Sequence, residues 1–333
     1  MTAVSRSALD PSLVALQRRL RTLAPDPSGI ADGDVVLERL VADAQPPRLV
    51  RAEVVEGGGM RARRVFGDPL VAFAAFLDGT QASHVVAYAD GFPIVLGTVA
   101  AVIRLRRNRR LTTWNRPVVR RRLYAPVGML SAAWNSAIEA LDIEIVDTTP
   151  SDTGDETGPH PFTLRDVAVH RVQQDREGAE QTLAERWCHH ERDPIFIDGG
   201  ISGSEKVAVS SCTVGVVKSH RTLYADGAGL QAVLRLRRGE RSSVFRITSP
   251  KRTTVASWYL RLRDNCGHDP MWGLVRVEIA HPPRPEESRV GARADEVSRW
   301  ILAEVAPLTL PDARWDKMAY GIRDCEEFLR AVT

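Results

Sequence analysis

Two apolar segments of this chain each end in an Asp-Gly pair. Residues 70–81 read LVAFAAFLDGTQ and place Asp78 after a hydrophobic run, and residues 194–205 read PIFIDGGISGSE and place Asp198 after another. A carboxylate that leaves a buried strand is costly unless it is paired or binds a cation. If the two strands are parallel neighbours about 4.8 Å apart, both side chains reach one cation at the sheet edge where ligands bind. Such oxygen ligands suit Mg²⁺ or Mn²⁺, and paired ions can activate a water for phosphodiester hydrolysis.

The same dipeptide also has a purely structural interpretation. Asp-Gly is the commonest tight-turn dipeptide, and Asp90-Gly91 and Asp226-Gly227 occur in the same chain. The segment after Asp198 continues into a Gly/Ser stretch and not at once into a partner strand, which favours a functional role there. We expect the glycine after each aspartate to leave room for a nucleic-acid backbone or a metal-bound water.

Basic residues are concentrated in one segment. Residues 104–122 contain nine arginines and no acid, although the net charge of the chain is only +3. This pattern indicates a face that contacts phosphates or, equally, a solvated strand edge that is protected against pairing. The arginines that we expect to contact nucleic acid are Arg106, Arg107, Arg109, Arg110, Arg120, Arg121 and Arg122.

The hydrophobic pattern predicts an α/β protein with a mixed sheet flanked by helices. Three strands form a meander over 70–77, 82–89 and 92–106, followed by strands at 194–198 and 212–220 and three more between 242 and 280. The predicted helices span 9–23, 31–44, 129–141, 163–190, 288–305 and 318–332. We divide the chain into an N-terminal extension of helices and short strands (1–65) and a main domain (66–333), with a polar loop or linker near 147–161.

Several classes of protein are excluded by composition and motifs. The longest apolar run, 92–103, is too short to span a bilayer, and no secretory signal is present. Four widely spaced cysteines without a CxxC pair suit a reducing cytoplasm. The segment WCHHERD (187–193) lacks a second ligand pair with zinc spacing. We therefore expect a cytoplasmic protein with no membrane partner.

Read together, AFLDGTQ (75–81), the helix before PIFIDGG and TVGVVKSH (213–220) resemble the NurA family of nucleases. The resemblance covers about residues 66–333. It implies an RNase H-like, Piwi-related fold in which a first strand ends in Asp-Gly-Ser and a helix carries a glutamate. A second Asp-Gly on a parallel strand and a Val-Gly-x-x-Lys strand follow. This chain has Thr80 where the family has serine.

The resemblance also implies roles for individual residues. Asp78 and Asp198 would be metal ligands, and Lys218 would lie near the scissile phosphate. The spacing in the family indicates that Glu180, eighteen residues before Asp198, is the helical glutamate. Two other glutamates on the same predicted helix stay open as alternatives, Glu177 and Glu185.

The C-terminal segment departs from the family pattern. The family ends in a Tyr-Pro-Leu…Ala-His motif whose histidine completes the site, whereas MAYGIRDCEEFLR (318–330) contains no histidine. Glu326 falls at the corresponding place, with Asp324 as the alternative. A carboxylate can replace histidine as an oxygen ligand.

These features predict a metal-dependent DNA nuclease that uses Mn²⁺ or Mg²⁺. What the resemblance implies further is a homodimer that acts with a HerA-type hexameric ATPase in DNA end processing, in repair or phage defence. The altered C-terminal motif favours an alternative, a non-catalytic nucleic-acid-binding subunit of such a complex. A resolvase-like nuclease of the same fold is a third hypothesis. The catalytic residues of the first hypothesis are Asp78, Glu180, Asp198, Lys218 and Glu326.

Overall fold

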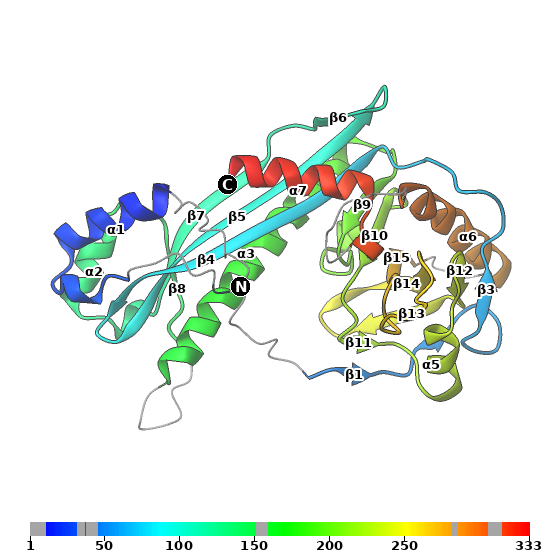
Figure 1. The fold of residues 1–333 in the computed structure, drawn as a ribbon, viewed down its shortest axis with the longest axis horizontal. Helices are drawn as coiled ribbons and strands as arrows, with labels where there is room; N and C mark the ends of the chain where they lie inside the picture. The colour runs from blue at the N-terminus through cyan, green and yellow to red at the C-terminus, as the bar shows by residue number, and fades with distance from the viewer. Residues whose placement is uncertain (1–10, 32–36, 38–45, 151–158, 282–285, 306–314) are drawn as a thin grey trace.

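Two long antiparallel strands run along the centre of the molecule. β4 (Ala75–Ala89) and β5 (Phe92–Arg107) are joined at Asp90-Gly91, where φ is 52° and 85°. Positive φ at both central residues is the type I′ pattern that matches the twist of a hairpin. This computed structural model describes residues 11–31, 37, 46–150, 159–281, 286–305 and 315–333. Figure 1 shows the hairpin linking an arm that carries α1 and α2 to a larger body.

β4 lies where two differently organised parts of one thirteen-stranded sheet meet. On one side it pairs with antiparallel β5, and on the other it pairs with the parallel strand β9, which is itself parallel to β10. The order across the main path is β2-β13-β14-β15-β10-β9-β4-β5-β7-β8. The strands other than β4 and β5 on this path are β2 (Glu53–Val54), β7 (Val118–Ala125), β8 (Ile145–Asp147), β9 (Ile195–Asp198), β10 (Thr213–Val217), β13 (Phe245–Ser249), β14 (Arg252–Arg261) and β15 (Leu274–Ala280).

Short strands extend this sheet at its margins. β6 pairs with β5, and β12 joins β3 to β14. A separate two-stranded parallel sheet is formed by β1 and β11. These strands are β1 (Arg48–Leu49), β3 (Ala62–Arg64), β6 (Arg110–Thr113), β11 (Thr222–Leu223) and β12 (Glu240–Ser242).

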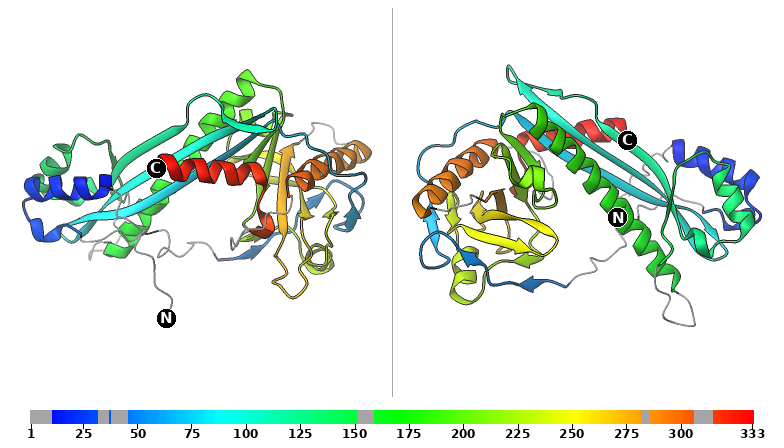
Figure 2. Two further views of the ribbon diagram at one scale, coloured as in Figure 1. Left: turned by 45° about the horizontal axis from the view of Figure 1, so that its top comes forward. Right: turned by 180° about the vertical axis from the view of Figure 1, so that it is seen from behind.

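Helices cover both faces of the sheet around β4. The long helix α3 lies on one face, and α7 and α6 lie on the other, as the two views of Figure 2 make clear. Because side chains alternate along a strand, Leu77 packs with the α3 cluster and Phe76 with the α6–α7 cluster. The first segment of β4 is therefore apolar on both faces. The helices are α1 (Pro11–Leu23), α2 (Ala132–Glu139), α3 (Pro161–His190), α4 (Glu205–Ala208), α5 (Gly227–Leu234), α6 (Glu287–Glu304) and α7 (Tyr320–Val332), with short 3-10 turns at Pro27–Gly29, Val127–Met129 and Trp315–Lys317.

Glycine permits the closest approach of α7 to the sheet. A Cβ on Gly321 would overlap the ring of Phe76, so only glycine fits at this crossing. The thiol of Cys325 donates to the carbonyl oxygen of Phe76 at 3.4 Å. These contacts fix the first turn of α7 over β4, which places the rest of the helix along the sheet.

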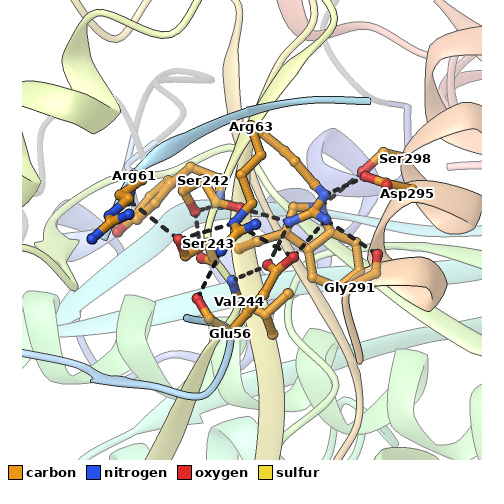
Figure 3. Close-up of polar contacts among 12 residues, drawn as sticks. Glu56, Arg61, Arg63, Ser242, Ser243, Val244, Gly291, Asp295 and Ser298 are labelled. Atoms are coloured by element: carbon orange, nitrogen blue, oxygen red, sulfur yellow. Dashed lines mark hydrogen bonds and ion pairs between the residues drawn. The ribbon is translucent and has the colours of Figure 1, made fainter. Parts of the chain in front are cut away.

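A buried ion cluster ties the N-terminal segment to the body (Figure 3). Arg241 of β12 donates to both carboxylate oxygens of Glu56 at 2.6 and 2.9 Å and to Asp295 of α6 at 2.6 Å. The backbone N–H of Val244 donates to Glu56 at 2.9 Å. Arg63 adds a second cation, 3.5 Å from Glu56. We call these side chains the Glu56 cluster.

Most predicted elements are confirmed, and one prediction is wrong. The helix over 163–190 and the parallel pairing of the two Asp-bearing strands are as expected. The meander is not: 70–77 and 82–89 do not form two strands, because DGTQ continues as extended backbone within β4. A single partner, β5, pairs with β4 across this segment, so no turn is needed.

The predicted helix over 31–44 lies almost wholly outside the described residues, as does most of the polar loop near 147–161.

The N-terminal segment interleaves with the rest of the fold. α1 buries its leucines against α2 and the distal part of the β4–β5 hairpin, while β2 and β3 pair with β13 and β12. Within the described part of the chain, no helix combines the length and the apolar character that crossing a membrane requires.

Candidate carboxylate site

Asp78 and Asp198 lie next to each other at the centre of the sheet. The parallel register pairs Leu77 with Ile197, so the next residues along β4 and β9 are the two aspartates. Phe76 and Phe196, two residues before the aspartates on their strands, pack in the cluster that includes α7. Because side chains alternate along a strand, Asp78 and Asp198 point to that same face. The two aspartates line one pocket of about 180 Å³ together with Gly79, Thr80, Glu326, Leu329 and Arg330. We call the group formed by Asp78, Asp198, Glu180 and Glu326 the carboxylate site.

The two aspartates occupy different positions in their strands. Asp198 is the last residue of β9, as predicted. Asp78 was expected to end a strand, but it is the fourth residue of a strand of fifteen. What ends beside Asp78 is the pairing with β9, so one edge of β4 becomes open at this residue. An interrupted neighbour, rather than a turn, creates the edge on which the two acids meet.

Asp78 is the most deeply buried acid of this site. Its exposed fraction is 7%, and the backbone N–H of Gly79 donates to its Oδ1 at 2.8 Å. Burial, and then the neighbouring charge of Asp198, raise the pKa of Asp78 well above its ordinary value. In this environment the ionised carboxylate is unfavourable, and binding of a proton or a cation lowers its free energy.

Lys218 is the cation that pairs with Asp198. It lies just beyond β10, two residues after Val216, the register partner of Asp198. Its Nζ is 2.7 Å from Oδ2 of Asp198, and both side chains are 16% exposed. Lys218 therefore neutralises Asp198 directly, while its expected position near a scissile phosphate stays a prediction.

Glu180 of α3 reaches the same edge from the other face of the sheet. A Cβ on Gly79 would overlap the Glu180 carboxylate, so the missing side chain of Gly79 provides the space for Glu180. The prediction that this glycine leaves room for a ligand is thus wrong at Gly79. At Gly199 a Cβ would meet nothing within 4 Å, so the space is open there and its use by a ligand stays a prediction.

The charge of Glu180 is only partly compensated. Arg176, one turn earlier on α3, donates to its carboxylate and also donates from Nε to Gln81 of β4 at 3.0 Å. Burial raises the pKa of Glu180 to about 7; Arg176 opposes this shift, and Asp198 adds to it. Glu180 thus interacts electrostatically with both aspartates although it approaches them across the sheet.

The alternative glutamates on α3 are engaged elsewhere. Glu177 accepts from Gln173 at 2.9 Å and its side chain is 50% exposed. Glu185 accepts from Ser204 at 2.7 Å and lies 3.5 Å from Lys206. Glu180, by contrast, interacts electrostatically with both Asp78 and Asp198. The sequence spacing therefore selected the glutamate that lies beside the aspartates.

Helix α7 brings a third carboxylate to the pocket that Asp78 and Asp198 line. Glu326 lines it beside the two aspartates, and Arg330, one turn later, lies 3.6 Å from Glu326. Asp324, the alternative, forms an ion pair with Arg104 of β5 and is not one of the residues that line the pocket. The structure thus places Glu326 of α7 in the pocket with Asp78 and Asp198, while its correspondence to the histidine of the family stays a prediction.

Metal-binding geometry is not complete in this arrangement. Across the residues that the structure describes, no three His, Cys, Asp or Glu side chains are grouped so that they could hold a metal ion. Instead, three of the acids face cations: Lys218 pairs with Asp198, Arg176 pairs with Glu180, and Arg330 lies beside Glu326.

A second pocket adjoins the site on the α3 face. It has a volume of about 220 Å³ and includes Asp198, Glu180, Arg176 and the loop 199–204, with the exposed Arg252 at its rim. Sequence reasoning missed Arg176 and Arg252. The spacing of Arg176 and Glu180, four residues apart on one helix face, was the available signal for the first; only the tertiary fold brings Arg252 here.

The fold divides the arginine-rich segment into different environments. Arg106 forms a bidentate pair with Glu304 at 2.8 and 2.5 Å, and Arg122 pairs with Asp175 at 2.7 Å and with Glu144 at 2.8 Å. These two arginines were expected to be available for phosphates, but acids from distant segments already bind them.

The remaining arginines lie in two places. Arg107, Arg109 and Arg110 are exposed at the tip of the β5–β6 hairpin, which projects from the molecule in Figure 1. Val102 is the register partner of Asp78, so this tip begins about 17 Å away, on the side opposite the end of β9. The other two lie on β7: half-buried Arg120, and exposed Arg121, which donates to the Thr333 carbonyl at 3.1 Å. Contact of either group with nucleic acid stays a prediction.

Comparison of the sequence with protein-family models and with curated proteins gives no match. The interpretation of the carboxylate site therefore rests on its own residues and geometry. The resemblance to the NurA family stays a prediction from short motifs.

Proposed function

We propose that this chain is a metal-dependent DNA nuclease with an RNase H-like core. The observation that carries the proposal is the meeting of Asp78 and Asp198 in one pocket from parallel neighbouring strands. The order β7-β5-β4-β9-β10, with antiparallel strands followed by parallel ones and a glutamate-bearing helix before β9, supports the RNase H-like assignment. Such a cluster of acids is expensive for a fold to keep unless it binds a cation.

The donor chemistry fits a hard divalent cation. Asp78, Asp198 and Glu180 offer only oxygen atoms, and burial, with a further contribution from neighbouring carboxylates, raises the pKa values of Asp78 and Glu180. These three residues would hold Mn²⁺ or Mg²⁺, which when bound supplies an activated water and stabilises a leaving oxygen.

The surrounding residues would bind and orient the substrate. Lys218 carries an ammonium group beside Asp198, from which it can reach a phosphate oxygen bound at the same edge. Glu326 and Arg330 of α7 close the pocket on one side and restrict the approach of water and substrate. Gly199 leaves open space beside Asp198 through which a backbone can approach.

The wider biological role is proposed from the resemblance. The resemblance to the NurA family supports a cytoplasmic homodimer that acts with a HerA-type hexameric ATPase. Together they would process DNA ends in repair or phage defence. Exposed arginines at the β5–β6 tip would track phosphates, so that DNA binding is salt-dependent and largely independent of sequence.

The test is cleavage by the Asp198→Asn variant. Single- and double-stranded DNA are incubated with the protein, alone and with its partner ATPase, in Mn²⁺, Mg²⁺ or chelator. We expect metal-dependent cleavage by the wild type and none by Asp198→Asn, with the melting temperature of the variant preserved. Asp166→Asn, on the same helix as Glu180 but paired only with its neighbour Arg165, is the matched control and keeps activity. Cleavage that survives in Asp198→Asn refutes the proposal.

A second function, a non-catalytic nucleic-acid-binding subunit, is favoured by one observation. Within the described ranges, the acids are not grouped as a metal site, and α7 offers Glu326 in place of a histidine. A protein of this kind binds DNA but gains no thermal stability from Mn²⁺, whereas a nuclease site gains stability in proportion to the occupancy of its metal. Thermal denaturation across a Mn²⁺ titration separates the two functions.

A further inference from the structure

Two cations are built into the carboxylate site from different elements. Lys218 follows β10 and lies 2.7 Å from Asp198, and Arg176 on α3 binds Glu180. Both ion pairs are mostly shielded from solvent, with exposed fractions between 13% and 22% for their four side chains. Such shielding makes their Coulombic attraction stronger than that of a surface pair.

These cations occupy carboxylates that a metal would need. Asp78 and Asp198 are neighbours in register, so a divalent cation shared by them would lie next to the Lys218 ammonium. Two positive groups at this distance repel each other strongly in a poorly hydrated site. The Lys218–Asp198 pair therefore weakens the binding of a metal in the arrangement described.

An anion has access to Arg176 and to Asp198, the carboxylate that Lys218 binds. The pocket on the α3 face includes Arg176, Asp198 and the open Gly199, and the exposed Arg252 adds positive charge at its rim. Glu177 and Glu180 also line this pocket, so an anion entering it must bind the arginines more strongly than it is repelled by these acids. Phosphate groups satisfy this condition because they form bidentate, charge-assisted hydrogen bonds with arginine.

We propose that Lys218 and Arg176 are resident counter-ions that weaken the binding of a divalent cation until phosphates of a bound nucleic-acid strand draw them away. Each cation then exchanges a carboxylate for a phosphate oxygen, and the released oxygens of Asp198 and Glu180 become available to the metal. Metal affinity and DNA affinity are consequently coupled, and each ligand tightens the binding of the other by the same factor. This inference rests on the proposed nuclease function and adds an order of loading to it.

The experiment measures Mn²⁺ binding without any cleavage. Free Mn²⁺ is followed by electron paramagnetic resonance during titration of the full chain, alone or with a single-stranded phosphorothioate oligonucleotide. An uncharged methylphosphonate oligonucleotide of the same sequence controls for contacts that do not involve phosphate charge. The variant is Lys218→Gln, and the matched control is Lys251→Gln, an exposed lysine in the turn between β13 and β14.

We expect the charged oligonucleotide to tighten Mn²⁺ binding by the wild type about tenfold, and the uncharged one to leave it unchanged. Lys218→Gln should bind Mn²⁺ about tenfold more tightly than the wild type without any oligonucleotide, and Lys251→Gln should match the wild type. Arg176→Gln provides a second variant with the same direction of change.

Two other results separate the inference from the proposed function. If the wild type binds Mn²⁺ equally well with and without the charged oligonucleotide, and Lys218→Gln binds it no more tightly, the counter-ion inference is overturned while the nuclease proposal survives. If none of the proteins binds Mn²⁺ under any of these conditions, the metal-dependent function itself fails, and the inference fails with it.

Discussion

Arg241 with Glu56 in the body, and Lys218 with Asp198 at the centre of the sheet, are both ion pairs between different elements of the fold. Around the first pair, every charge has a partner of opposite sign. Burial alone raises the pKa of Glu56, but the hydrogen bonds and charge of Arg241 outweigh it, and the pKa is lowered. Around the second pair, Asp78 keeps a strongly raised pKa because burial and Asp198 outweigh the help from Lys218.

The two clusters show how a fold uses buried charge differently. The Glu56 cluster joins the N-terminal segment, β12 and α6, and its hydrogen bonds satisfy the carboxylate fully within the protein. The carboxylate site assembles acids from β4, β9, α3 and α7 with too little positive charge. A balanced cluster stabilises the fold, whereas an unbalanced one is retained at a cost to stability, which is typical of binding sites.

The largest expected effect is the loss of Arg241. Replacement by methionine leaves the buried Glu56 and Asp295 without their shared cation, and breaking a buried pair in this way costs about 3–5 kcal/mol. Urea denaturation at pH 7.5 measures the change in the free energy of unfolding. Arg246→Met, which removes an exposed pair with Glu53, is the control and should cost less than about 1 kcal/mol. A similar small loss in both variants would mean that the Glu56 cluster does not stabilise the fold.

A matched pair of glycines compares the rigidity of the two clusters. A Cβ on Gly291 would lie 2.5 Å from Oε1 of Glu56, and a Cβ on Gly79 would likewise overlap Glu180. Glu56 is fixed by several donors, so Gly291→Ala should destabilise by about 1–3 kcal/mol, whereas Glu180 can move away and Gly79→Ala should cost less than about 1 kcal/mol.

A third glycine provides the control for helix propensity. Gly178 lies within α3, and a Cβ there would meet nothing within 4 Å. Gly178→Ala should therefore stabilise the protein by about 0.5–1 kcal/mol. The comparison would be wrong if Gly79→Ala proved more destabilising than Gly291→Ala in the same urea experiment.

Removal of the Asp78 charge is expected to stabilise the protein. Because the native pKa of Asp78 is raised, its ionised form weakens the fold above that pKa, and the penalty disappears as the pH falls toward the unfolded value. Asp78→Asn should therefore raise the free energy of unfolding by about 1 kcal/mol at pH 8, with a gain that shrinks toward pH 4.

Glu56→Gln supplies the contrast to this result. The lowered native pKa of Glu56 contributes stability above its unfolded value, and that contribution is lost as the pH falls through the native pKa. The variant should be less stable than the wild type at pH 8, with a smaller difference at pH 4. Denaturation curves of both variants at the two pH values test the comparison, and a loss of stability in Asp78→Asn at pH 8 would contradict it.

Local pattern was enough to find the acids of the site. Apolar runs that end in Asp-Gly identified Asp78 and Asp198, and the helix length with family spacing identified Glu180. Pattern was not enough to distinguish a turn from a continuous strand at DGTQ, because extended backbone through a glycine depends on a partner strand. For the same reason the arginine block looked unpaired: Glu304 and Asp175, the partners of Arg106 and Arg122, are remote in sequence.

The sequence by itself determined the strands, the long helix and the acidic residues at the point where the strands become polar, because these follow from short-range hydrophobic periodicity. The spacing of four residues on α3 already pairs Arg176 with Glu180, but only the tertiary structure decided that Asp198 receives Lys218 and that Asp78 receives no cation that suffices. Charge balance inside a fold depends on distances between elements that are far apart in the chain, and local sequence does not specify those distances.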